Sequence, residues 1–450
     1  MASMGQQAAE AATIDHRDGA KAWSVVSILT AAYALAYVDR QILNLLVDPV
    51  KHSLGLTDIE ISLLQGFSFM AAYICFVPVM GRLVDTGNRR NILFVGCSLW
   101  CLFTAMCGMA DGFWELFLAR VGVGASEACI LPAGWSLIAD YFSARKAPRA
   151  FSIFTLGPLV GGGLALIAGG AVVASADNLR GLFPSLVALE TWQIAFIMVG
   201  LAGLTIAALL LTFREPPRTS RSGAAIDDRT FTTREALGFI WDRRQFYGRF
   251  MLGIGMIAIV LLGLPAWMPA FLTRYHGVDR ALVGFQFGSL VLIAGSLGVL
   301  AGPMIARWFE ARGREDALVR LAALSTIIMV PSCAAIPFLP TPGAVLAATA
   351  IAVLSYSMPT SLIAAALQVG TPNRVRGTVA ALTTFTTQVM GLGLAPTGIA
   401  FFTDRVFGDP AMVGWSLSIV CTVASACAAW MMISVMPHFR ATLALDRQAA

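Results

Sequence analysis

The sequence predicts an all-α membrane protein of twelve transmembrane helices in two pseudo-symmetric six-helix bundles. Three observations predict this fold class. The 450-residue chain is 57% hydrophobic and only 13% charged, about half the charged fraction of an average soluble protein. Twelve apolar stretches are each long enough to cross the roughly 30 Å hydrocarbon core of a bilayer. A loop pattern in the first half of the chain also returns in the second half.

The twelve apolar stretches use nearly the whole chain. The residues before the first stretch are polar and mixed in charge, without the basic start and cleavage site of a signal peptide, so this stretch is expected to stay as a helix. The stretches begin near Trp23, Ile61, Asn91, Trp114, Arg149, Trp192, Phe246, Ala281, Ala317, Gly343, Gly377 and Met412.

The distribution of Lys and Arg predicts the orientation in the membrane. The termini and even-numbered loops hold 24 of the 31 Lys and Arg, the opposite loops hold five, and Arg40 and Arg120 fall inside stretches. Because cytoplasmic loops collect positive charge, both termini are expected in the cytoplasm and the protein in a plasma or inner membrane. This topology accounts for the net charge of +5, so no nucleic-acid partner is expected.

One long polar segment divides the stretches into six and six. Its apolar residues alternate with charges at helical spacing, which fits an amphipathic helix on the membrane surface and, equally, a solvated helix. The predicted parts are an N-terminal cytoplasmic tail (1–22), a first bundle (23–213), a cytoplasmic linker (214–245), a second bundle (246–436) and a C-terminal cytoplasmic tail (437–450).

The loop after the second stretch, GRLVDTGNRR from Gly81, has a weaker echo 221 residues later, GPMIARWFEARGR from Gly302. Two related bundles can rock against one another, which favours alternating access around a central site.

Glycine at position 81 would permit close helix approach. Asp85 and Arg89 could form a charge latch on the cytoplasmic gate; plain anchoring of the loop explains the arginine but leaves Asp85 unexplained. Asp140 and Arg149, at the two ends of the loop after the fourth stretch, are further gating candidates.

The loop GRLVDTGNRR from Gly81 resembles the loop between the second and third helices of the major facilitator superfamily. The segments YALAYVDRQILN, SLLQGFSF and ARVGVGASEA resemble the spinster branch of the superfamily. The resemblance implies the major facilitator fold and an amphipathic anionic substrate, such as a lysophospholipid or a sphingolipid-like molecule. GPLVGGG at 157–163 instead resembles a motif associated with antiporters, so symport and antiport both stay open.

Four charges lie inside the apolar stretches: Asp39, Arg40, Arg120 and Glu127. Each costs about 2.5 to 3.5 kcal/mol at mid-membrane, so each calls for a partner or a water-filled cavity. Asp39 or Glu127 is the candidate proton-coupling carboxylate, because burial and a nearby arginine shift its affinity for a proton in opposite directions. A static ion-pair network is the alternative. Both arginines, and also Glu127, are candidate substrate ligands.

The second half has no acid or base near mid-membrane. Trp267, Tyr356 and Thr383 are candidates to line the substrate site there. Helix packing explains hydroxyl side chains in membrane helices as well, and a tryptophan can anchor a helix at the membrane interface.

Other function classes fit less well. The four histidines lie far apart in sequence, so no catalytic or metal constellation is visible and the protein is not expected to be an enzyme. The sequence has no G-x-x-x-x-G-K-[ST] loop for ATP. We therefore expect a secondary transporter, driven by protons and without a cofactor, that works among membrane lipids and is by default a monomer. A small organic anion or a drug is the alternative cargo, and a channel is the rival class.

Overall fold

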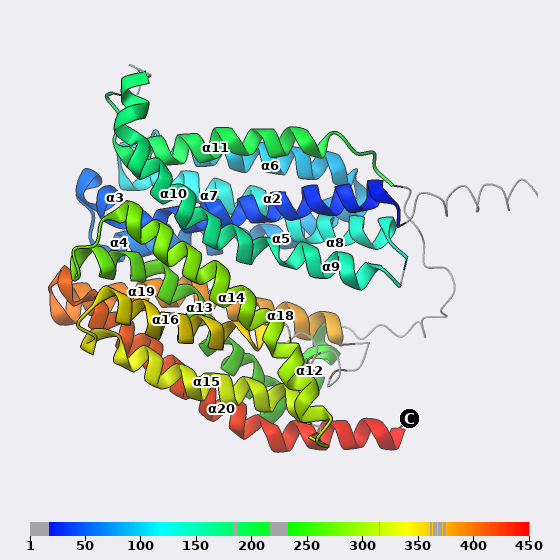
Figure 1. Ribbon diagram of the computed structural model, residues 1–450. Coiled ribbons are helices and arrows are strands. Elements are labelled where there is room, and N and C mark those ends of the chain that lie inside the picture. Colours follow the sequence, from blue (N-terminus) through cyan, green and yellow to red (C-terminus); the bar gives the residue numbers. More distant parts are fainter. Residues whose placement is uncertain are drawn as a thin grey trace, which may run out of the picture. The chain divides into compact units, whose positions relative to one another are not determined.

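The computed structural model describes residues 18–449, except 144, 183–186, 217–232, 315, 361, 363–366, 368–370 and 372–374. Its regular elements are all helices, and no described residue lies in a strand (Figure 1). Most of the predicted N-terminal tail and the middle of the predicted linker lie outside the described residues. The chain separates into two compact units, here unit 1 (residues up to 42, 71–165 and 172–224) and unit 2 (residues 43–70, 166–171 and those from 225 on).

Unit 1 is built around a pair of helices, α6 and α11, that lie side by side (Figure 1). The packing depends on Gly200, because a Cβ there would lie 2.6 Å from the backbone of both Cys101 and Ala105. The side chain of Asn88 caps the first turn of α6 by accepting from the amide of Asn91. The helices of unit 1 are α2 (Ala20–Leu45), α5 (Ser68–Thr86), α6 (Arg89–Cys107), α7 (Phe113–Glu127), α8 (Ile130–Tyr141), α9 (Ala147–Thr155), α10 (Gly157–Leu182) and α11 (Thr191–Leu210).

Unit 2 is built around α20, which packs against α13 and α15. It takes in α3 (Val47–Leu54), α4 (Asp58–Ser62) and the π-turn η1 (Leu63–Phe67), which precede α5 in the chain. Its other elements are α12 (Thr233–Asp242), α13 (Arg244–Arg274), α14 (Arg280–Glu310), α15 (Ala317–Ala335), η3 (Ile336–Phe338), α16 (Pro342–Ser357), α18 (Arg376–Gln388), η4 (Val389–Leu394), α19 (Ala395–Phe401), η5 (Phe402–Phe407), η6 (Pro410–Met412) and α20 (Val413–Ala449). Residues 43–70 therefore belong to the first predicted bundle by sequence and to unit 2 by contact.

An ion pair fixes the start of α15 to α20. The buried carboxylate of Asp316 accepts from Arg320 Nη2 at 3.1 Å and from Arg440 Nη2 at 2.6 Å. Burial by itself raises the pKa of Asp316, but the two arginines outweigh it and hold that pKa below its ordinary value.

The helices are long and apolar enough to span a membrane. Eleven in the described part of the chain meet that description, and Pro342–Ser357 is a shorter apolar helix. They begin within about three residues of the predicted starts, as with Ala20 against Trp23. Large apolar side chains such as Trp114, Leu300 and Trp430 are more than 60% exposed, as expected of surfaces that face lipid. The prediction of an all-helical membrane protein is confirmed.

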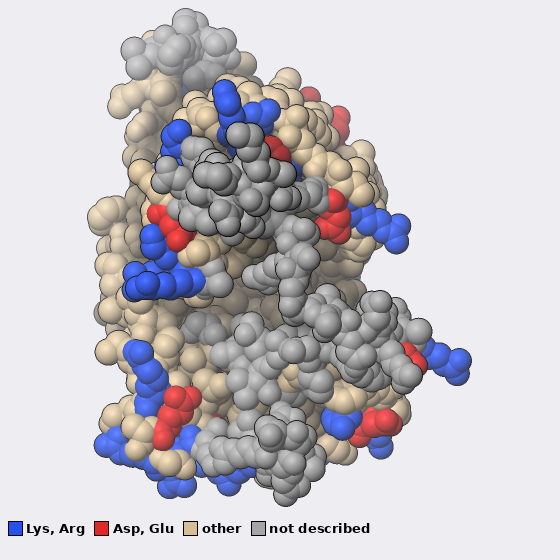
Figure 2. Space-filling view, turned by 90° about the vertical axis from the view of Figure 1, so that its right-hand side faces the viewer, with Lys and Arg blue, Asp and Glu red and all other residues tan. Residues whose placement is uncertain are grey.

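Figure 2 shows one face of the molecule, on which Lys and Arg side chains lie together with Asp and Glu side chains. The orientation with both termini in the cytoplasm, and the predicted bounds of the two bundles, remain predictions.

Candidate functional site

The charged residues predicted inside the first half meet in unit 1. Arg40 of α2 forms an ion pair with Glu127 of α7 through its Nη2, and Arg40 Nε donates to the other carboxylate oxygen at 3.3 Å. The Glu127 side chain is fully buried, and that of Arg40 is 10% exposed. A guanidinium held at both carboxylate oxygens is the strongest arrangement of this pair. This ion pair joins the first and fourth transmembrane helices.

Two tyrosine rings cover the guanidinium of Arg40. Its Cζ lies 4.6 Å from the ring centroid of Tyr37 and 5.6 Å from that of Tyr73. Cation–π contacts of this kind stabilise a cation by about 0.5 to 2 kcal/mol, with the larger values at desolvated sites. Carboxylate and aromatic rings thus share the same cation, and a substrate anion that reaches Arg40 must compete with Glu127 for it.

Asp39 and Arg120 make a second connection between the same helices. Arg120 Nη1 donates to the backbone carbonyl of Asp39 at 2.9 Å, and both residues are fully buried. Neither carboxylate oxygen of Asp39 has a hydrogen-bond partner among the described residues. An ionised carboxylate without hydrogen bonds is costly in such surroundings.

The three candidates of the second half lie inside unit 2. The Trp267 side chain is 0% exposed, and its Nε1 donates to the carbonyl of Pro396 at 3.0 Å. The hydroxyl of Thr383 is directed to its own helix, where it donates to the carbonyl of Val379 at 2.7 Å. Tyr356 is 3% exposed. All three side chains are buried, and complete burial argues against Trp267 as an interfacial anchor.

Two of the predicted gating residues are in contact. Arg89 forms an ion pair with Asp140, and its Nη1 also donates to Ser136 Oγ at 2.8 Å. A third partner, Glu215, accepts from Arg89 Nε at 2.6 Å and from the amide of Arg90 at 2.9 Å. Arg89 is 1% exposed, so it is a buried hub and not the lipid-surface anchor that the sequence also allowed.

The other gating candidates are outside this hub. Asp85 and Arg149 are exposed. A Cβ at Gly81 would meet no heavy atom within 4 Å, so the close helix approach expected at this glycine is not observed.

Several site residues were not predicted from the sequence. Tyr37 and Tyr73 lie within the motif-bearing helices, and the charge on Arg40 could have directed attention to them. Glu215 follows the sixth stretch and looked like an ordinary linker residue. In the part of the chain that the structure describes, no three His, Cys, Asp or Glu lie close enough together to hold a metal ion.

Comparison with known proteins gives a consistent picture. The family model of the Major Facilitator Superfamily matches residues 29–396. The chain is 26% identical over 413 residues, 90% of each chain, to an MFS-type efflux pump of Mycolicibacterium smegmatis. It is 29% identical to protein spinster homolog 1 of Xenopus tropicalis over 66% of this chain and 56% of that protein, so it spans little more than half of that relative's length.

Among solved structures, the fold matches that of a bacterial homologue of the human lysosomal transporter spinster in an inward-facing and unoccupied conformation. The TM-score is 0.78 at 23% identity, over 95% of this chain and 96% of the other. The predicted fold and the spinster-like resemblance are confirmed. The chain belongs to the Major Facilitator Superfamily and is a membrane transporter.

Proposed function

We propose that the protein couples protons to the movement of an amphipathic, anionic, lipid-like substrate by alternating access. The proposed substrates are lysophospholipids and sphingolipid-like molecules. The observation that carries the proposal is the buried pair of Arg40 and Glu127, with the hydrogen-bond-free carboxylate of Asp39 next to it in the chain. The resemblance to spinster proteins supports the choice of cargo.

The Arg40–Glu127 pair supports a competition mechanism. While Glu127 is ionised, it occupies the guanidinium at both oxygens. A proton on Glu127 would remove that charge and leave Arg40 to bind a phosphate or carboxylate of the substrate, for which a guanidinium is well suited. Proton uptake and anion binding would then favour each other at this site.

Asp39 offers a second position for the proton. Its carboxylate oxygens make no hydrogen bond of normal geometry with a described residue, although the Thr104 hydroxyl lies close to them, so the neutral carboxyl group avoids the cost of an unsolvated charge. Arg120, which donates to the backbone carbonyl of Asp39, would hold α2 and α7 together whether the Asp39 side chain is protonated or ionised. In this scheme Asp39 carries the coupling proton and Arg40 contacts the cargo.

Transport by purified protein in liposomes tests the proposal. Uptake of a radiolabelled anionic lysophospholipid is measured with and without a pH gradient, for the unmodified chain, Asp39→Asn and Glu127→Gln. Asp177→Asn is the matched control, because its carboxylate is 95% exposed. We expect gradient-driven uptake in the unmodified protein and the control, and only passive equilibration in Asp39→Asn. An Asp39→Asn protein that still accumulates the lipid against its gradient refutes the assignment of the proton to Asp39.

A different cargo on the same fold is the second candidate. The efflux pump of M. smegmatis aligns with 90% of the chain, more than the spinster homologue does, which favours a drug or a small organic anion. A protein that moves no lysophospholipid, but shifts the luminal pH when small organic anions or cationic dyes are added, would support this alternative.

A further inference from the structure

Residues 43–70 make an unusual set of contacts. This segment contains α3, α4 and η1, lies between two helices of unit 1 in the chain, and packs with the residues of unit 2. Its neighbours are α19, η4 and η5, more than 300 residues away in sequence. The contacts are of two kinds, charged at one end of the segment and closely packed at the other.

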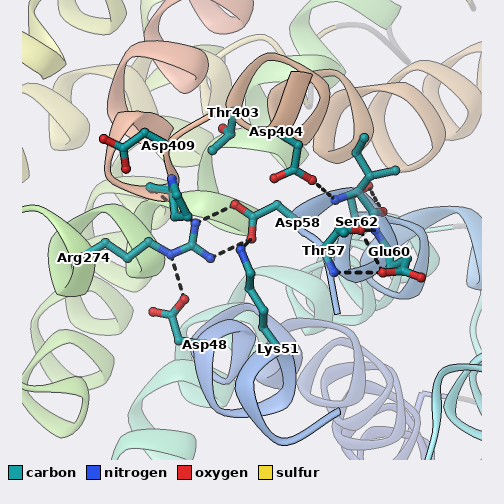
Figure 3. Close-up of polar contacts among 12 residues, drawn as sticks. Asp48, Lys51, Thr57, Asp58, Glu60, Ser62, Arg274, Thr403, Asp404 and Asp409 are labelled. Atoms are coloured by element: carbon teal, nitrogen blue, oxygen red, sulfur yellow. Dashed lines mark hydrogen bonds and ion pairs between the residues drawn. The ribbon is translucent and has the colours of Figure 1, made fainter. Parts of the chain in front are cut away.

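The charged contacts centre on Arg274, the last residue of α13 (Figure 3). Arg274 Nε donates to Asp48 at 2.7 Å, and Nη1 and Nη2 donate to the two carboxylate oxygens of Asp58 at 2.7 and 2.9 Å. Lys51 Nζ donates to Asp58 at 2.5 Å. We call these four residues the Arg274 cluster. Its two acids and two bases balance in charge, and the Asp58 side chain is fully buried.

Further hydrogen bonds hold α4 in the same place. Asp404 of η5 accepts from the amide of Ile59 at 2.8 Å (Figure 3). The hydroxyl oxygens of Ser62 and Thr397 lie 3.3 Å apart, while the Ser62 hydroxyl donates to the carbonyl of Ile59 at 2.6 Å; the Ser62 side chain is completely buried. These contacts connect the start of the second transmembrane helix to the eleventh at two successive levels.

Close backbone packing follows one turn further along. At Gly66 a Cβ would overlap the carbonyl oxygen of Leu392, so the two π-turns η1 and η4 meet backbone to backbone. A second contact of this type lies elsewhere in unit 2, where a Cβ at Gly170 would lie 2.8 Å from the Ala281 carbonyl. Small residues allow such surfaces to separate and meet again without repacking of large side chains.

We propose that the Arg274 cluster is a latch that closes the transport path on the side of α3, and that it opens in each transport cycle. The predicted topology puts this side outside the cell. The proposal rests on transport by alternating access, and it is independent of the cargo. In such a cycle the site must open on one side at a time, so the contacts that join the early helices to the late ones on that side must break.

The chemistry of the cluster suits a reversible latch. Its charges lie at the ends of helices, and the side chains of Lys51 and Arg274 are 16% and 9% exposed. Charges that regain water on opening recover much of the interaction that they lose, so a pair of this kind changes little in net free energy. The same geometry requires both acids to face the arginine, which makes the closed state specific.

Accessibility of a single engineered cysteine tests the latch without any substrate. Ser62→Cys buries its thiol in the closed state, and peptide mass spectrometry follows its reaction with a membrane-impermeant maleimide, separately from the eight native cysteines. In the Arg274→Gln background we expect labelling to rise at least about tenfold, because the rate follows the open population. Arg405→Gln is the matched control, since Arg405 is exposed. Ser416→Cys, also 0% exposed, reports general loosening.

Labelling of Ser62→Cys that does not rise in Arg274→Gln overturns the proposal, as does an equal rise at Ser416→Cys.

A second measurement does not depend on the arginine variant. Ser62→Cys with Thr397→Cys should form a disulfide that stops lysophospholipid uptake until it is reduced. Thr403→Cys with Ser416→Cys is the matched pair, because those hydroxyls are 2.8 Å apart outside the cluster, and it should leave uptake intact. A locked protein that transports normally refutes the latch, whereas an unlocked protein that moves no lipid refutes only the cargo.

Discussion

Replacing Arg89 by methionine removes a buried cation and keeps most of its volume. Arg89 Nε and Nη1 contact Glu215 and Asp140, and Nη2 donates to the Pro216 carbonyl at 3.1 Å. Removal of one partner from a fully buried ion pair costs about 3 to 5 kcal/mol. The side chains of Asp140 and Glu215 are 11% and 21% exposed, so water solvates part of the freed charge. We therefore expect a loss of about 2 to 3 kcal/mol in the free energy of unfolding, at or just below the lower limit of that range.

Unfolding by denaturant in mixed micelles, followed by tryptophan fluorescence, measures this loss. Arg82→Met is the matched control from the same loop, since Arg82 is exposed, and it should change stability by about 0.5 kcal/mol at most. The triple variant Arg89→Met, Asp140→Asn, Glu215→Gln should recover much of the loss, because no uncompensated charge is left. If Arg89→Met is as stable as Arg82→Met, the buried hub contributes nothing and the reasoning is refuted.

Three other substitutions test particular contacts. Asp316→Asn should lower the free energy of unfolding by about 1 kcal/mol at pH 7. Because the folded-state pKa of Asp316 is depressed, the difference in this free energy from the unmodified protein should shrink as the pH falls below about 4, the ordinary pKa of an aspartate. A difference that is the same at pH 3 and pH 7 contradicts the ion pair. Gly66→Ala places a methyl group on the Leu392 carbonyl and should cost about 1 to 3 kcal/mol, whereas Gly81→Ala, which meets open space, should leave thermal stability unchanged. Trp267→Phe removes a buried indole hydrogen bond and should cost about 1 kcal/mol with normal uptake of the lysophospholipid; a raised KM with unchanged stability would instead make Trp267 a substrate contact.

Composition and hydropathy were enough to predict the fold class and the position of each transmembrane helix. The reason is physical: a bilayer forces every span to be a long apolar helix, so each span appears in the sequence as a long apolar stretch between polar loops. The same cost of burial directed attention to Asp39, Arg40, Arg120 and Glu127, and the structure joins α2 and α7 through these residues.

The partners of many charges could not be predicted in the same way. Lys51 and Arg274 counted only as positive charges on the sparsely charged side, and nothing along the chain connects Arg274 to Asp48 and Asp58 across more than 200 residues. Likewise, burial of Trp267 against Pro396 depends on the packing of α13 with α19. Contacts of this kind follow from the tertiary arrangement, which hydropathy does not encode.

The π-turns η1, η4 and η5 have a consequence for chain length. A π-turn holds one residue more than the α-turn that it replaces and takes up that residue locally. An extra residue in a regular α-helix would instead rotate every later side chain by about 100°. Deletion of a single residue within η1 or η4 could therefore convert the turn to regular α-helix, while a deletion within α6 would misalign a whole packed face. Changes of one residue in length between related chains should accordingly concentrate at these turns, and a homologue without the extra residue would keep the same helix face toward its neighbours.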